Sequence, residues 1–362
     1  MGYTQHDALT PGEALTEQIA ARKPQGYGRR PPKPSAVFPD YQWATQTPAQ
    51  AKLDSVSLNR LRDFVGGHGC VVRHGYLVYS WGKSDGMYDI ASAFKPILST
   101  LMLMAVQEGK LPGPDAEVAD YEPRLRELNG GKDKAMTFRH LASQTSGYGL
   151  SERPGEAYAY NDYALALYYD VLTEKVFGQS GNEILKTRLG EPLQFSDPYT
   201  FTVFGASNRP GRLGCSVRDL ARIGLLYLRG GRWKDRQLLT PEHVRLATTS
   251  PIPATIPLTK AQDALMLAGQ RSIGGTKNIT SLGPGCYSFN WWLNVENPPN
   301  GQLYPALPPS TFIASGHTPR REMVVIPEWD LIVVWNEAKL ALGDTEGAQV
   351  AMQWIAKSVA NR

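Results

Sequence analysis

The chain has 362 residues, of which 42% are hydrophobic and 20% charged, a composition typical of a globular protein with one large core or two lobes. Its formal net charge of +4 comes from charges interspersed along the chain, which argues against a nucleic-acid-binding surface. No segment approaches the ~18 consecutive apolar residues of a membrane helix. We therefore expect neither a nucleic-acid partner nor a membrane span.

The N-terminal part of the chain is rich in proline and arginine. We predict that residues 1–51 form an extended arm, because the prolines of ARKPQGYGRRPPKPSAVFPD exclude helix and internal strand and its arginines favour solvent. The first residues lack the apolar core of a signal peptide. We expect either a cytoplasmic protein or an exported one whose leader has been removed, and the sequence does not decide between them.

The segment after the arm predicts a helix, a hairpin and a second helix. Residues 53–64 place apolar side chains at helical spacing, and CVVRHGYLVYSWG alternates like two strands joined at His74-Gly75. The run PILSTLMLMAVQEG, residues 96–109, is apolar on nearly every face and closes at a glycine. These features predict a buried helix, with His74 as a turn residue.

The rest of the chain changes from helical to strand-like patterns. Residues 111 to about 228 give short helical runs, and the strand-like runs CYSFNWWLNV, MVVIPE and LIVVWNEA follow before a helix over residues 344–360. We predict an α/β (α+β) fold whose sheet is built from both ends of the chain. Its sheet domain covers residues 52–108 and 229–362, and a mainly helical domain covers residues 109–228.

Cysteine and histidine are too few and too scattered to indicate a metal site. Cys70, Cys215 and Cys286 cannot all pair with one another and show no CxxC spacing, so we expect buried apolar thiols. The six histidines show no HExxH spacing. We expect no catalytic metal and no cofactor.

The first candidate for chemistry is the pair Ser92 and Lys95, at the start of the apolar helix. A spacing of three residues puts both side chains on one helical face, where the helix dipole activates the serine and burial is expected to lower the pKa of the lysine. Ser80 and Lys83 have the same spacing, but they lie on a predicted strand, where it does not bring them together. An ordinary surface serine and lysine remain the alternative for Ser92 and Lys95.

Two further segments carry polar side chains that could assist such a serine. Tyr160, Asn161 and Asp162 stand before a predicted helix, where the phenol could relay a proton, the alternatives being tyrosine packing and an N-cap role for Asp162. In SGHTPR, residues 315–320, a strand edge could donate a backbone N–H to an oxyanion. Proline has no N–H, so Arg320 is the predicted donor, and an ordinary polar loop between strands is the alternative for this segment.

Together, in this order, the segments resemble the active-site set of the serine β-lactamase-related superfamily. YDIASAFKP resembles its nucleophile motif, YND its Tyr-x-Asn motif, and GHTPRREMVVIPEWDLIVVW the strand that follows its Lys-Thr-Gly or His-Gly-Gly element. TFRHLASQTSGYG and GCSVRDLARIGLLYLRGGRWKDRQLLTPEHV are similar to supporting stretches of that superfamily. The likeness runs from about Leu53 to the C-terminus and includes class C β-lactamases, penicillin-binding proteins, family VIII esterases and aminohexanoate-oligomer hydrolases.

The resemblance implies a role for each matching residue. Ser92 would be the nucleophile, Lys95 the base and Tyr160 the group that passes the proton to the leaving group. The N–H groups of Ser92 and Arg320 would form the oxyanion hole. The fold implied is β-lactamase/transpeptidase-like, with an antiparallel sheet flanked by helices and a helical lobe.

Departures from the superfamily pattern concern the handling of substrate. Asp162 stands at the usual asparagine, with Asn161 one place earlier, and Asp162 would repel an anionic β-lactam. His317 lacks the permanent charge of a lysine for holding a carboxylate. We therefore expect esterase or amidase activity, with weak or no β-lactamase activity, and Trp292 is a candidate for the acyl pocket, although tryptophan pairs are often core residues.

These observations predict a serine hydrolase that cleaves a small-molecule ester or amide through an acyl-serine intermediate. A non-catalytic binding protein on the same scaffold, a transacylase and a D-amino-acid peptidase are the alternatives. The sequence does not disclose the natural substrate or the oligomeric state.

Overall fold

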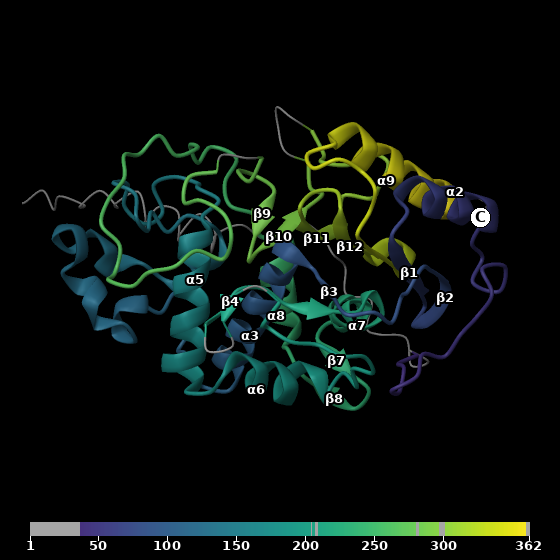
Figure 1. The fold of residues 1–362 in the computed structure, drawn as a ribbon, viewed down its shortest axis with the longest axis horizontal. Coiled ribbons are helices and arrows are strands. Elements are labelled where there is room, and N and C mark those ends of the chain that lie inside the picture. Colours follow the sequence, from purple (N-terminus) through teal and green to yellow (C-terminus); the bar gives the residue numbers. More distant parts are fainter. Residues whose placement is uncertain (1–36, 204, 207–208, 280–281, 297–300, 360–362) are drawn as a thin grey trace, which may run out of the picture.

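The computed structural model describes residues 37–203, 205–206, 209–279, 282–296 and 301–359. Most of the predicted arm, residues 1–36, lies outside this set. The main sheet has seven strands in the order β2-β1-β13-β12-β11-β10-β9, and every neighbouring pair is antiparallel (Figure 1). The strands are β1 His68–Arg73, β2 Tyr76–Trp81, β9 Tyr287–Ser288, β10 Trp291–Leu293, β11 Phe312–Gly316, β12 Arg321–Ile326 and β13 Leu331–Asn336.

The sheet joins segments from the two ends of the chain, as predicted. β1 pairs with β13 over its whole length, from His68 opposite Asn336 to Arg73 opposite Leu331. The predicted hairpin is also confirmed, with His74 at its turn at a φ of 55°. The expected antiparallel sheet flanked by helices is therefore correct.

Alternating side chains give the sheet two buried faces. Leu331 and Val333 of β13 pack towards α2 (Ser55–Val65) and α9 (Thr345–Val359), two helices that contact each other. Ile332 and Val334 enter the larger core on the opposite face, where α7 (Val217–Leu228) lies against β1, β12 and β13. This period of two is what a sheet covered on both faces requires.

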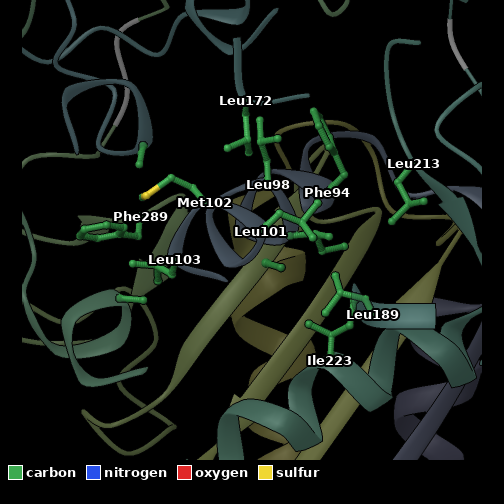
Figure 2. Packing of buried hydrophobic residues seen from close by; sticks show 14 of the residues in the cluster. Phe94, Leu98, Leu101, Met102, Leu103, Leu172, Leu189, Leu213, Ile223 and Phe289 are labelled. Atoms are coloured by element: carbon green, nitrogen blue, oxygen red, sulfur yellow. The ribbon is translucent and has the colours of Figure 1, made fainter. Parts of the chain in front are cut away.

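The predicted apolar helix is α3 (Lys95–Gln107), and it lies in the centre of the larger core. Figure 2 shows its residues Leu98, Leu101 and Leu103 among side chains from other segments, including Leu172 and Ile223. Because α3 is buried on all sides, its N-terminal turn has a fixed position relative to the sheet.

Ser92 lies just before α3, in one turn of 3₁₀ helix, η1 (Ala91–Phe94), rather than in the α-helix itself. Pro96 explains the tighter turn, because it has no N–H to donate to the Ser92 carbonyl in the α-helical pattern. The Lys95 N–H donates to that carbonyl instead.

Residues 111–228 contain the predicted short helices, and several of these are 3₁₀ or π turns. The remaining helical elements are η2 Val118–Asp120, η3 Pro123–Arg126, η4 Leu128–Ala135, α4 Phe138–Ala142, α5 Asp162–Asp170, η5 Val171–Phe177, α6 Gly181–Leu185, η6 Lys186–Gly190, α8 Pro241–Thr249 and η7 Pro327–Trp329. Three two-stranded ribbons pair β3 Tyr88–Asp89 with β6 Gly214–Cys215, β4 Gly205–Ala206 with β5 Arg209–Pro210, and β7 Arg232–Trp233 with β8 Arg236–Gln237.

The three cysteines are free and buried, as predicted. None of the helices in the described part of the chain is both long and apolar enough to cross a membrane.

Candidate active site

A cavity of about 370 Å³ lies where η1, α5 and β11 meet. Ser92, Lys95, Tyr160, Asp162, Trp292 and His317 all line it, so the structure brings together six of the eight residues singled out in the sequence. Asn161 and Arg320 are not among the lining residues.

The Ser92 hydroxyl and the Lys95 amine face each other across one turn. Lys95 Nζ lies 3.1 Å from Ser92 Oγ and donates a hydrogen bond to it. Ser80 and Lys83, which have the same spacing, lie in β2 and in the turn that follows it. The pair at the helix start is therefore the one whose side chains meet in the cavity.

The Lys95 side chain is almost completely buried, yet it has an ionic partner. Only 2% of the side chain is exposed, and Nζ donates to Asp162 Oδ1 at 2.6 Å. Nζ also lies 3.7 Å from the centre of the Tyr160 ring, within range of a cation–π interaction. Lys95 Nζ thus has a carboxylate partner in the interior, which the sequence argument, based on burial alone, did not include.

Tyr160 reaches the cavity from the segment before α5. Its backbone pairs with Ile279 through two hydrogen bonds, and its ring stacks on Trp292 with 6.4 Å between the ring centres. Burial raises the pKa of the phenol, and the nearby charge of Asp162 raises it further, while a hydrogen bond with Ser92 acts in the opposite direction. At neutral pH the phenol is therefore a proton donor placed beside the serine.

Asn161, rather than Asp162, has the N-cap role that was considered in the sequence. Asn161 is the N-cap of α5, because its Oδ1 accepts from the N–H groups of Tyr163 and Ala164, and its amide donates to the Tyr148 carbonyl. The interpretation of Asn161 as a substrate-binding residue is therefore corrected. Because Asn161 caps the helix, the carboxylate of Asp162 is available to Lys95.

Hydrogen bonds from neighbouring segments hold the turn that carries Ser92. Ala91 has a φ of 45°, an uncommon conformation for a residue with a side chain, and Asp89 Oδ1 accepts a hydrogen bond from its N–H. Arg212 holds the Asp89 carboxylate with two hydrogen bonds, at 2.6 and 3.2 Å. Functional sites commonly contain such strained residues held by their surroundings.

β11 approaches this turn so closely that only glycine fits. A Cβ atom at Gly316 would lie 2.4 Å from the Ile90 carbonyl oxygen and 3.1 Å from the Ser92 nitrogen. The end of β11 therefore lies directly against the backbone amide of the serine.

Arg320 does not occupy the position predicted for it. Its N–H donates to the His317 carbonyl, 2.9 Å away, which closes the turn between β11 and β12. This N–H is already engaged, so the prediction of Arg320 as the oxyanion donor is wrong.

His317 follows Gly316 and lines the cavity. Its Nδ1 accepts a hydrogen bond from the guanidinium of Arg321. Partial burial lowers the pKa of the imidazole, and the charges of Arg321 and Arg212 lower it further. The ring is neutral at pH 7 and supplies no fixed positive charge.

Sequence reasoning missed several cavity residues, including Arg212, Ser315 and Thr318. The motif SGHT contained part of the signal, since a glycine beside a polar strand end can mark a close backbone approach. Arg212 gave no such signal, because it lies far from this motif in the chain.

The comparisons with known proteins show the family of the chain. A family model described as Beta-lactamase matches residues 58–335, most of the chain. The chain belongs to the beta-lactamase family. The β-lactamase/transpeptidase-like fold expected from the resemblance is thereby confirmed.

Relatives of this beta-lactamase family member include an esterase and several solved structures. Esterase EstB of Burkholderia gladioli is 33% identical over 125 residues, which cover 30% of this chain and 32% of the esterase. The match therefore spans about a third of that relative's length. A mutant of simvastatin synthase from Aspergillus terreus has a TM-score of 0.61 at 13% identity, covering 87% of this chain and 97% of the synthase. A penicillin-binding protein homologue from Caulobacter crescentus has a TM-score of 0.57 at 15% identity, covering 89% and 99%. At these identities the two structures show the shared fold.

Removing the carboxylate of Asp162 tests the ion pair at the centre of the site. Asp162→Ala leaves the Lys95 ammonium buried without its partner, and we expect the free energy of unfolding to fall by about 3–5 kcal/mol. Urea denaturation followed by circular dichroism measures this change. Asp120→Ala is the matched control, because Asp120 pairs with Arg126 while both side chains are at least half exposed, and it should have little effect. Equal effects of the two substitutions would contradict a stabilising role for the Lys95–Asp162 pair.

Proposed function

We propose that the protein is a serine hydrolase that cleaves a small-molecule ester or amide through an acyl-Ser92 intermediate. The observation that carries the proposal is the 3.1 Å contact of Ser92 Oγ with Lys95 Nζ, in a cavity that the Tyr160 phenol also reaches. A nucleophile, a basic group and a proton donor within reach of one another are the parts that acyl transfer requires. Membership of the beta-lactamase family and the likeness to an esterase support the same reaction.

In the first step Ser92 Oγ attacks the substrate carbonyl carbon and loses its proton to the Lys95 amine. Lys95 first has to lose one of its own protons, and the Asp162 carboxylate, 2.6 Å away, is placed to take it. That transfer turns the buried ion pair into a neutral pair. When substrate excludes water from the site, the neutral pair is favoured because charges are costly without water. The ion pair thus holds Lys95 in place until substrate excludes water.

Collapse of the tetrahedral intermediate releases the alcohol or amine. Tyr160 donates its proton to that leaving group, and the proton is restored from Ser92 by way of Lys95. A water molecule then attacks the acyl-serine ester, with the same groups acting in reverse order. The net reaction is hydrolysis, and no cofactor enters any of these steps.

We infer that the oxyanion is held by the N–H groups of Ser92 and His317. Gly316 lies against the Ser92 amide, so the residue that follows it is the nearest candidate for a second donor. Two converging backbone N–H groups form the usual oxyanion hole for acyl transfer. His317 thus replaces Arg320 in this role.

The walls of the cavity favour an uncharged, largely apolar substrate. Phe94, Ile273, Ile279, Trp292 and Leu342 line it together with the polar groups of the site. His317 is neutral, and Arg212 is bound to Asp89, so the fixed charges suit an anionic β-lactam poorly. We propose esterase or amidase activity, with weak or no turnover of β-lactams.

Substitutions at Ser92 and Tyr160 test the roles of nucleophile and proton donor. With p-nitrophenyl acetate, Ser92→Ala should reduce turnover to background and abolish the initial burst of p-nitrophenol, because no acyl-enzyme forms. Tyr160→Phe keeps the ring that contacts Lys95, and with an alkyl ester such as ethyl acetate we expect kcat/KM to fall at least about 100-fold, because an alkoxide leaving group needs the proton whereas p-nitrophenolate leaves without one.

The same experiment separates the alternatives. A burst in the wild type excludes a pure binding protein, and competition between water and an amine acceptor separates a hydrolase from a transacylase by the ratio of products. Full turnover by Ser92→Ala would disprove the proposal.

Gly316→Ala tests the close approach of β11 to the nucleophile. The new methyl group has to displace backbone atoms of η1 or β11, so we expect kcat/KM to fall about 100-fold, a loss typical of a misplaced reacting group. Gly113→Ala is the matched control, since a Cβ there meets nothing within 4 Å. An unchanged kcat/KM in Gly316→Ala, measured with the same ester, would rule out an oxyanion hole at this contact.

A further inference from the structure

A buried carboxyl group stands behind the cavity and takes no part in the chemistry described so far. Glu322 lies in β12 opposite Ser315 of β11, and only 1% of the residue is exposed. Its Oε1 is hydrogen-bonded to Ser315 Oγ at 2.6 Å. Within the described residues its Oε2 has no hydrogen-bond partner, an uncommon state for a buried carboxyl oxygen.

The hydrogen bond of Glu322 continues to the cavity through two hydroxyl groups. Ser315 Oγ also lies 2.6 Å from Thr318 Oγ1, and both Ser315 and Thr318 line the cavity. A carboxyl, a serine and a threonine thus form a chain that runs from the interior of the protein to the substrate site.

The direction of this chain depends on the proton of Glu322, because each hydroxyl has a single proton to donate. A protonated Glu322 donates to Ser315, which donates to Thr318, which then donates to a group in the cavity. An ionised Glu322 accepts from Ser315, which accepts from Thr318. In that state Thr318 presents only lone pairs to the cavity.

The surroundings of Glu322 favour the protonated state. Burial raises its pKa to about 8, although the hydrogen bond from Ser315 acts in the opposite direction. Tyr304 is a titratable neighbour of Glu322. Burial raises the pKa of its phenol, and an ionised Glu322 would raise it further, so Tyr304 is uncharged and supplies no counter-charge to Glu322. The indole N–H of Trp335, which is the cross-strand neighbour in β13, donates to the Pro319 carbonyl.

We propose that Glu322 is a positioning residue that, through Ser315, makes Thr318 a hydrogen-bond donor to an acceptor oxygen of the substrate. The inference rests on the proposed function, since it concerns the substrate of the same cavity. It adds a feature of that substrate: a carbonyl or similar oxygen besides the one that Ser92 attacks.

The pH dependence of KM tests the inference. We compare p-nitrophenyl acetate with the p-nitrophenyl ester of N-acetylglycine, whose acyl group carries an additional carbonyl oxygen, after subtracting spontaneous hydrolysis. For the second ester the wild-type KM should rise up to about tenfold between pH 7 and pH 9, as Glu322 ionises. For the acetate, which lacks the second acceptor, this rise should be absent.

Variants assign that rise to the chain of hydroxyls. Glu322→Gln keeps a donor towards Ser315 at every pH, so its KM for the N-acetylglycine ester should stay flat to pH 9. Thr318→Val should raise KM for this ester at all pH values and remove its pH dependence, and Thr318→Ser should restore both. The same alkaline rise in Glu322→Gln, or an unchanged KM in Thr318→Val, would overturn the inference.

Thermal unfolding provides a second readout that does not depend on turnover. The folded wild type keeps a proton on Glu322 that the unfolded chain loses above its ordinary pKa, so the stability of the wild type relative to Glu322→Gln should fall from about pH 4.5 to pH 8. A constant difference in Tm would contradict the buried acid. Absence of a Ser92-dependent burst in the wild type would instead count against the proposed function, so the two failures are distinguishable.

Discussion

The rest of the site depends on the contacts of the buried Lys95 side chain, above all its ion pair with Asp162. The side chain contacts the Ser92 hydroxyl in η1, the Asp162 carboxylate at the start of α5, and the ring of Tyr160 just before that helix. A charge this deep in a protein is costly unless it is paired, so these contacts stabilise one another. Any segment that moved would leave a buried charge without its partner. The same contacts therefore set the geometry of the candidate site and join the start of α3 to the start of α5.

The fold places each of these groups by packing rather than by local sequence. α3 is buried on every side, which fixes the turn before it, and the α5 end is fixed because Asn161 caps the helix. β11 completes the site because Gly316 allows its backbone to reach the Ser92 amide. Rigid elements of this kind hold reacting groups to within the fractions of an ångström that catalysis requires.

Much of this arrangement could be predicted from the sequence. Periodicity predicted α2, the β1–β2 hairpin, α3 and α9, and the helix context distinguished Ser92 and Lys95 from Ser80 and Lys83. The division into an arm, a sheet domain and a helical domain stays a prediction. A sheet that combines both ends of the chain followed from the strand-like runs there, although the pairing of β1 with β13 and its register did not.

The errors arose where tertiary contacts decide the outcome. Arg320 was chosen because Pro319 has no N–H, but the turn between β11 and β12 engages the Arg320 N–H, and the approach of Gly316 was not visible from spacing. The Asp162 partner of Lys95 was not foreseen, because burial was considered alone and Asp162 lies 67 residues further along the chain. Glu322 gave no signal at all, since a strand pattern does not reveal which polar residue faces the interior.

The most direct test of the account is a crystal structure of the protein after reaction with a p-nitrophenyl phosphonate. We expect a covalent bond from phosphorus to Ser92 Oγ, with the phosphonyl oxygen between the N–H groups of Ser92 and His317 and Lys95 Nζ within hydrogen-bonding distance of Oγ. Phosphorus bound to any other side chain, or a phosphonyl oxygen turned away from both N–H groups, would contradict the account.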